Sequence, residues 1–333
     1  MELRASRARL GRMVRAVQWW DFKLIPIFSI FYATALVQHV PVTSMWPAVI
    51  GLLLAIAPGA AYVSVINDIT DRADDRRAGK VNRLAGKPSW LLTLLVAAPV
   101  TVGVVFTFLW RDDGLLVSAY LCAWAAFSLY SLPPFRLKSR AGLGIIADAS
   151  GAHLFPTLVA ILLSFRATGQ PVDYMWLAAA GVWAFACGLR GILWHQLADL
   201  ENDRKAGVQT FVVRYSAPIA VRLANYLAFP VELAALALLL WRMQSVFPVL
   251  SLLLYAIFVA LKAWLWRIRL VIAEPRERHS IVGQEFYNFF FPLGILTACV
   301  LFHPVDWMIL VAHLLIFPAP AISVAAASGW CET

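Results

Sequence analysis

The sequence predicts an all-α fold: a polytopic membrane bundle of nine transmembrane helices, or ten, with a pseudo-two-fold internal repeat. Composition, long apolar runs and a motif that occurs twice support this prediction. Of the 333 residues, 61% are hydrophobic and only 14% are charged, whereas an ordinary soluble domain is about half apolar and about one quarter charged. A single soluble core stops growing near roughly 250–300 residues, so it could not bury this much apolar side chain. The composition also excludes a disordered chain.

Ten apolar runs approach or exceed the roughly 20 residues that a helix needs to cross a bilayer. They occupy residues 22–40, 46–66, 89–109, 114–131, 142–165, 174–197, 217–241, 246–266, 285–302 and 305–326. Only two residues, His303 and Pro304, separate the last two runs, so the number of spans is nine or ten. We expect one membrane domain over 1–333, with a basic N-terminal segment at 1–20 and the helical bundle at 22–326.

The basic residues lie on alternate loops. The N-terminal segment and four further regions, 72–87, 136–140, 204–222 and 267–278, hold 22 of the 28 Lys and Arg residues. Basic loops stay on the cytoplasmic side of a membrane. The sequence therefore predicts an integral protein of the bacterial inner (plasma) membrane, with its N-terminus and these loops in the cytoplasm. Because the net charge of +9 is spread over five regions, it does not indicate nucleic-acid binding.

Acidic residues gather at the ends of two predicted spans. Seven of the 19 lie in the segments 67–75 and 199–203. Asn67, Asp71 and Asp75 are spaced by four, which places them on one helical face. Asp199 and Asp203 repeat this step. Carboxylates at membrane-embedded helix ends are costly, so they indicate a function.

The two acidic segments are copies of one pattern. Asp71-xxx-Asp75-Arg-Arg-Ala-Gly and Asp199-xxx-Asp203-Arg-Lys-Ala-Gly are offset by 128 residues, which indicates an internal repeat. A two-fold-like bundle would bring both acidic faces to one cytoplasmic cavity. Oxygen ligands suit Mg²⁺ or Mn²⁺, and Mg²⁺ commonly combines carboxylates with phosphate oxygens. Basic residues follow both segments, so the pattern favours a diphosphate site over a solvated, orienting loop.

Three motifs in this order resemble the UbiA superfamily of intramembrane prenyltransferases. Residues 67–75 fit its first signature, NDxxDxxxD, and residues 199–203 fit its second, DxxxD. Residues 130–138 look like the family's YSxPPxRLK loop. The resemblance extends over about residues 20–300. His195 and Gln196 depart from the family pattern, because relatives often have Tyr or other residues before the second motif.

The resemblance implies a bundle of about nine spans in which Mg²⁺ holds a prenyl diphosphate between the two acidic motifs. The implied metal ligands are Asn67, Asp68, Asp71, Asp75, Asp199 and Asp203, and the implied catalytic set is Asp71, Asp75, Asp199 and Asp203. The implied diphosphate-binding residues are Asn67, Arg83, Arg136, Lys138, Arg140 and Lys205.

Further polar and aromatic residues inside the spans are candidates for the cavity that holds the acceptor or the prenyl chain. They are Lys23, Tyr62, Tyr130, Asp148, His153, Arg190 and His195, with Glu285 and Asn288 as further intramembrane polar residues. Asp148 stands out because an unpaired acid in lipid is expensive. Aromatic side chains such as Trp194, Phe286 and Tyr287 are suited to stabilise a carbocation.

The predicted function is a Mg²⁺-dependent transfer of a prenyl group from a prenyl diphosphate to an aromatic or other lipophilic acceptor, through an allylic carbocation. The expected partners are this donor, the acceptor and the lipid bilayer, and no nucleic acid. Two alternatives use similar sites: a terpene cyclase, which needs no acceptor, and transfer of a sugar phosphate to a polyprenyl phosphate. A third alternative is a transporter built on a repeat, although acids on one side only argue against it.

Overall fold

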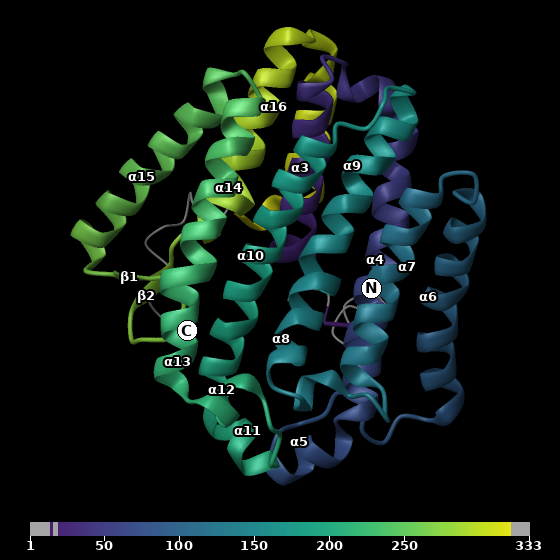
Figure 1. Ribbon diagram of the computed structural model, residues 1–333, viewed down its shortest axis with the longest axis vertical. Helices are drawn as coiled ribbons and strands as arrows, with labels where there is room; N and C mark the ends of the chain where they lie inside the picture. Colours follow the sequence, from purple (N-terminus) through teal and green to yellow (C-terminus); the bar gives the residue numbers. More distant parts are fainter. Residues whose placement is uncertain (1–13, 16–18, 321–333) are drawn as a thin grey trace, which may run out of the picture.

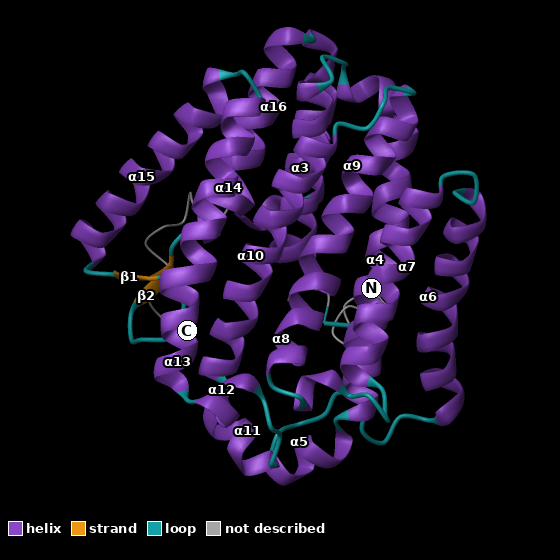
Figure 2. Cartoon of the chain, viewed as in Figure 1, coloured by secondary structure: helices purple, strands orange, loops and turns teal. Residues whose placement is uncertain are grey.

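The computed structural model describes residues 14–15 and 19–320, which form a helical bundle with one pair of short strands (Figures 1 and 2). Within these residues the all-α prediction is confirmed, because the only strands are β1 (Arg269–Val271) and β2 (His279–Ile281), paired in parallel. Most of the predicted basic segment at 1–20 lies outside the described residues, as does the end of the last predicted run, 321–326.

Helices account for nearly all regular structure. The α-helices are α3 (Ile25–Val37), α4 (Trp46–Thr70), α5 (Arg72–Ala78), α6 (Ser89–Leu109), α7 (Gly114–Ser131), α8 (Gly142–Ala149), α9 (Phe155–Thr168), α10 (Tyr174–Ala198), α11 (Leu200–Ala206), α12 (Phe211–Tyr215), α13 (Ala217–Leu223), α14 (Phe229–Arg242), α15 (Val246–Trp266), α16 (Phe291–Phe302) and α17 (Trp307–Ile316). Four segments are π-helical: η1 (Trp20–Leu24), η4 (Ser150–Leu154), η5 (Ala224–Ala228) and η6 (Phe286–Phe290). The 3₁₀ turns are η2 (Val42–Met45), η3 (Leu137–Ser139) and η7 (Pro304–Asp306).

Eight helical stretches within the described residues are long and apolar enough to cross a membrane, as expected of an integral membrane protein. They correspond to the first eight predicted runs. The last two runs form shorter apolar helices, Phe286–Phe302 and Pro304–Ile316. The membrane bundle is therefore confirmed, whereas the number of spans, nine or ten, stays a prediction.

The internal repeat extends to the backbone. Helices α4 and α10 both have 25 residues, and each ends at an aspartate with nearly the same dihedral angles: φ −95° and ψ 1° at Asp71, φ −94° and ψ 6° at Asp199. Each is followed by a seven-residue helix, α5 or α11, that ends at a left-handed glycine, Gly79 or Gly207. Glycine suits these caps because a Cβ disfavours positive φ. Helices α5 and α11 pack together at the lower end of the bundle (Figure 1).

Burial separates inner helices from outer ones. Helix α10 packs against α8, α9 and α14, and its Trp176 and Trp183 are almost completely buried. Helices α6 and α15 lie on opposite flanks of the bundle (Figure 1), and most of their apolar residues are exposed. In a membrane protein such faces contact lipid tails, so only the inner helices enclose an interior.

We predict that two glycines of α10 respond in opposite ways to alanine. A Cβ at Gly188 would lie 2.9 Å from the Cα of Ala149 and 2.9 Å from Cδ2 of His153. Gly188→Ala should therefore lower the free energy of unfolding by roughly 1–3 kcal/mol through overpacking. The measurement is reversible unfolding in mixed micelles.

Gly191 provides the matched control, because nothing lies within 4 Å of its virtual Cβ. Gly191→Ala should raise the free energy of unfolding by about 0.5–1 kcal/mol, since alanine loses less conformational freedom in a helix. Equal effects of the two substitutions would contradict the packing of α10 against α8 and η4.

Candidate functional site

A cavity of about 670 Å³ lies inside the bundle, between α3, α4, α7, α9, α10 and η6. Asn67 and Asp199, one from each acidic motif, line it together with Arg15. Aromatic side chains from several helices form much of its wall, among them Tyr62, Trp124, Phe127, Trp183 and Tyr287. The cavity therefore has charged groups from both motifs and a wall suited to an apolar chain.

Most of the predicted cavity residues line this space. They are Lys23, Tyr62, Asp148, His153, Arg190 and His195. Tyr130 is not among the lining residues, and its role stays a prediction. Phe127, about one turn earlier on the same face of α7, lines the cavity.

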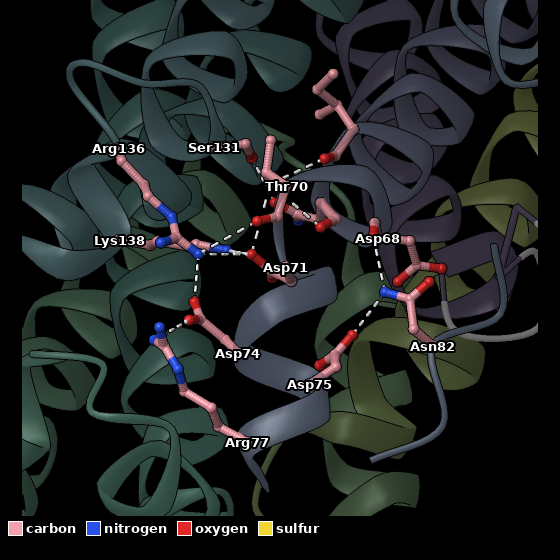
Figure 3. A network of polar contacts seen from close by, with 12 residues as sticks. Asp68, Thr70, Asp71, Asp74, Asp75, Arg77, Asn82, Ser131, Arg136 and Lys138 are labelled. Atoms are coloured by element: carbon pink, nitrogen blue, oxygen red, sulfur yellow. Dashed lines mark hydrogen bonds and ion pairs between the residues drawn. The ribbon is translucent and has the colours of Figure 1, made fainter. Parts of the chain in front are cut away.

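The first acidic motif is held by the loop after α7 (Figure 3). Lys138 donates to Oδ1 of Asp71, and Arg136 donates to the same oxygen at 3.1 Å and to Oδ2 of Asp74. Lys138 is 7% exposed, and this burial lowers its pKa to about 8. Two of the predicted basic residues of this loop, Arg136 and Lys138, thus reach the first acidic motif.

Four further hydrogen bonds order this motif. Asp68 is fully buried, and Arg15 donates to its Oδ1, while its Oδ2 has no partner among the described residues. Asn82 donates from Nδ2 to Oδ2 of Asp75 and to the backbone oxygen of Asp68, both at 2.7 Å (Figure 3). Asn67 accepts a hydrogen bond from Ser131. These hydrogen bonds therefore fix the side chains of the motif in one arrangement.

The second motif meets the first through a lysine. Nζ of Lys80, which follows α5, lies 3.1 Å from Oδ1 of Asp199, at the start of α11. Burial, and then the negative charge of Asp199, raise the pKa of Asp203 to about 6. Asp203 therefore carries negative charge that its surroundings compensate only in part.

The acidic residues fit a divalent cation by their chemistry. Their donors are all oxygen, the set that Mg²⁺ prefers. A cation would relieve the raised pKa of Asp203 and satisfy the buried Oδ2 of Asp68. In the described part of the chain no three His, Cys, Asp or Glu side chains converge as a metal cluster. Lys138 and Arg136 pair with Asp71, and Lys80 pairs with Asp199.

Three predicted diphosphate ligands lie apart from this network. Arg83 and Lys205 are exposed, and neither forms an ion pair with a described residue. Arg140 is also exposed and donates to the backbone oxygen of Pro134 at 3.0 Å. Their role in binding stays a prediction.

Arg190 is engaged by an acid that the sequence analysis did not single out. Its Nε and Nη2 donate to the two carboxylate oxygens of Glu232 at 2.7 and 2.8 Å, and the Tyr287 hydroxyl donates to Oε1 at 2.8 Å. Glu232 is fully buried. The charge of Arg190 is thus compensated within the bundle. An acid inside the apolar run 217–241 was the available signal.

The family model described as the UbiA prenyltransferase family matches residues 25–271 of this chain. Among curated proteins, a lycopene elongase/hydratase of Haloarcula japonica is 27% identical over 49% of this chain and 53% of its own length. A 2-acylphloroglucinol 4-prenyltransferase of Humulus lupulus is 28% identical over 52% of this chain and 43% of its own. A probable homogentisate phytyltransferase 2 of Oryza sativa subsp. japonica is 30% identical over 55% and 49%. The chain spans about half the length of these relatives.

Solved structures of a UbiA homologue from Archaeoglobus fulgidus share the fold. One of them covers 88% of this chain and 98% of that chain, with 17% sequence identity and a TM-score of 0.57. Another, of the homologue bound to GPP and Mg²⁺, covers 98% and 100% with 16% identity and a TM-score of 0.49.

We predict that Glu232→Ala destabilises the bundle strongly. It leaves the buried guanidinium of Arg190 without its partner, which costs about 3–5 kcal/mol of unfolding free energy. Replacing both partners, in Glu232→Leu with Arg190→Met, should recover most of this loss. Unfolding in mixed micelles measures all the variants.

The exposed ion pair between Asp112 and Arg166 is the control, with the two side chains 67% and 29% exposed. Asp112→Ala should change stability by no more than about 1 kcal/mol. A similarly small effect of Glu232→Ala would show that Arg190 is not held by this acid.

Proposed function

Because the chain belongs to the UbiA prenyltransferase family, we propose that it transfers a prenyl group from a prenyl diphosphate to an aromatic or other lipophilic acceptor inside the membrane. One observation carries the proposal: Asn67 and Asp199, from two acidic helix ends, line the polar part of a cavity with aromatic walls. The names of the hop and rice relatives, which specify aromatic acceptors, support an aromatic acceptor here. The polar side chains that line the cavity, among them Lys23 and Asp148, favour a transferase over a cyclase, because a cyclase needs only apolar walls that shape the prenyl chain.

The donor's diphosphate binds where acids and bases already neutralise one another. The oxygens of Asn67, Asp68, Asp71, Asp75, Asp199 and Asp203 would hold Mg²⁺, which would supply the charge neutralisation that makes diphosphate a better leaving group. Lys138 and Arg136 pair with Asp71, and Lys80 pairs with Asp199; in this proposal the three cations contact diphosphate oxygens. Basic groups fixed in this way stabilise the charge that develops on the leaving oxygen.

The prenyl chain occupies the aromatic part of the cavity. When the allylic C–O bond breaks, both electrons leave with the diphosphate and the allyl group becomes a cation. The rings of Tyr62, Trp124 and Trp183 line this space, and each ring near a cation stabilises it by roughly 0.5–2 kcal/mol. The apolar wall also keeps water from the cation until the acceptor supplies an electron pair for the new bond. The proton that the acceptor then loses passes to the released diphosphate.

The site faces the cytoplasm of a bacterial cell in this proposal. The contacts of Lys80, Arg136 and Lys138 all lie at the end of the bundle that carries α5 and α11. The regions richest in Lys and Arg share this end, and such regions are retained on the cytoplasmic side. The donor's charged group would therefore enter from water and its tail would lie within the membrane.

We predict that the purified protein, incubated with Mg²⁺, geranyl to geranylgeranyl diphosphates and a panel of acceptors, forms prenylated products detectable by mass spectrometry. Asp71→Ala and Asp199→Ala should each abolish Mg²⁺-dependent diphosphate release, a loss of at least about 1000-fold, because each removes a charge on which donor ionisation depends. Both variants should still insert and elute as the wild type does in detergent.

Glu201→Ala is the matched control, since Glu201 lies between the motif aspartates but is exposed, and among the described residues it pairs only with Arg204. Its activity should stay within about threefold of the wild type. Normal turnover in Asp71→Ala or Asp199→Ala would refute the mechanism, and a cyclic product formed without acceptor would identify a cyclase.

We predict that pyrophosphate binds most tightly, in the presence of Mg²⁺, between about pH 6 and pH 8. Below about pH 6 Asp203 gains a proton, since its pKa is raised to about 6, and loses the charge that attracts a cation. Above about pH 8 Lys138 loses its proton, since its pKa is lowered to about 8, and no longer attracts an anion. Calorimetry over this range measures the profile.

Lys138→Arg tests the upper limb, because arginine stays charged at all these pH values. The fall in affinity above pH 8 should become shallower than in the wild type, while the titration of pyrophosphate itself is common to both proteins. Superimposable profiles would contradict the assignment to Lys138.

A further inference from the structure

The internal repeat continues past the two acidic motifs into the loops that follow them. The N–H of Lys80 and the N–H of Val208, 128 residues apart, each donate to the carbonyl of the last aspartate of their own motif, at 2.8 and 3.0 Å. Leu84 and Val212 are separated by the same offset, and both are fully buried. Corresponding residues of the two loops can therefore be compared one for one.

In the first loop, Asn82 forms two kinds of hydrogen bond. Its Nδ2 donates to Oδ2 of Asp75 at 2.7 Å, and its Oδ1 accepts from the N–H of Leu84 at 3.0 Å. An amide side chain can do both, because it carries a donor and an acceptor. The first bond orients the carboxylate of the motif, and the second holds the loop that carries Asn82.

In the second loop, the residue that corresponds to Asn82 is Thr210, and the two roles are divided. The N–H of Val212 donates to Oε1 of Gln196, at 3.3 Å. Gln196 corresponds to Asp68 of the first repeat and is one of the two residues that depart from the family pattern. Because Gln196 holds the loop, the hydroxyl of Thr210 is left for the aspartate of the second motif.

The hydroxyl of Thr210 is buried without a regular partner. The residue is 6% exposed, and its Oγ1 forms no hydrogen bond of regular geometry with a described residue. Burial of an unpaired hydroxyl is costly, so such a group calls for an explanation. Thr210 lies close enough to Asp203 to lower the pKa of that carboxyl, against the burial that raises it. The hydroxyl therefore stands beside Asp203 without fixing it in one position.

We propose that Thr210 is the positioning residue of Asp203, as Asn82 is that of Asp75, and that its hydroxyl donates to one carboxylate oxygen while the other binds a divalent cation. This inference rests on the proposed function, which makes Asp203 a metal ligand, and it adds the residue that orients this ligand. A hydrogen bond to a ligating carboxylate fixes its direction, and the loss of such a bond typically lowers metal affinity by about 10–100-fold.

The test is direct binding of Mn²⁺, which accepts the same oxygen ligands as Mg²⁺, to the full chain in detergent, with free Mn²⁺ measured by electron paramagnetic resonance. Thr210→Val replaces the hydroxyl by a methyl group and should weaken binding by about tenfold. Thr210→Ser keeps the donor and should bind within about twofold of the wild type. The matched control is Thr107→Val on the outer helix α6, where the hydroxyl donates to the carbonyl of Gly103 at 2.9 Å; its Mn²⁺ affinity should equal that of the wild type.

The melting temperature without metal separates a positioning role from a structural one. Thr210→Val should melt at or above the wild-type temperature, because an unpaired buried hydroxyl contributes no stability. Asn82→Ala should melt at a lower temperature, because it breaks the hydrogen bonds to Asp75 and Leu84. Added Mn²⁺ should raise the melting temperature of the wild type, since it binds the folded chain, and should raise that of Thr210→Val by less.

Three results would each overturn the proposal: unchanged Mn²⁺ affinity in Thr210→Val, equal losses in Thr210→Val and Thr210→Ser, or a metal-free melting temperature of Thr210→Val as low as that of Asn82→Ala. Absence of Mn²⁺ binding by the wild type would refute the metal site of the proposed function, and this inference with it. Normal Mn²⁺ binding that Thr210→Val leaves unchanged refutes this inference alone, so the two failures are distinguishable.

Discussion

The rest of the site depends on two bends in the backbone, at Asp71 and Asp199. Inside a membrane, every backbone polar group has to find its partner within the protein. Both bends meet this constraint, because the N–H of Asp71 still donates to Asn67 and that of Asp199 to His195, each at 2.9 Å. The chain therefore changes direction without exposing its polar groups. Each bend ends a long span and starts a short helix, and the packing of α5 against α11 then brings the two acidic motifs together.

The resulting site is a balanced set of charges and not an open cluster of acids. Its cations come from distant parts of the chain: Arg15 before the first span, Lys80 after α5, and Arg136 and Lys138 after α7. Pairing of this kind roughly offsets the cost of removing the charges from water and contributes little net stability. Its effect is on ligand choice. In the proposed function, the ligand brings both a cation for the acids and an anion for the bases, which is the composition of a metal diphosphate.

Local sequence patterns predicted the helical bundle, but they did not predict which side chains pair with one another across it. Apolar runs and the four-residue spacing of the acids are visible in the sequence because hydropathy and helical period act over a few residues. The pairing of Arg190 with Glu232, 42 residues away, has no such signature. The position of Asn82 in the sequence likewise does not predict that its side chain donates a hydrogen bond to Asp75. The family motif locates the loop after α7, but it does not reveal that Tyr120, Trp124 and Phe127 line the cavity.

The π-helical segments affect how the cavity can change in evolution. A π turn contains one residue more than an α turn, and one residue rotates the following helix face by about 100°. Gain or loss of a single residue at η1, η4 or η6 can therefore be absorbed locally, as a π turn appears or is lost. The membrane-facing surfaces beyond it keep their register. At these three segments, an insertion or deletion of one residue can alter the lining of the cavity while the surrounding helices keep their packing.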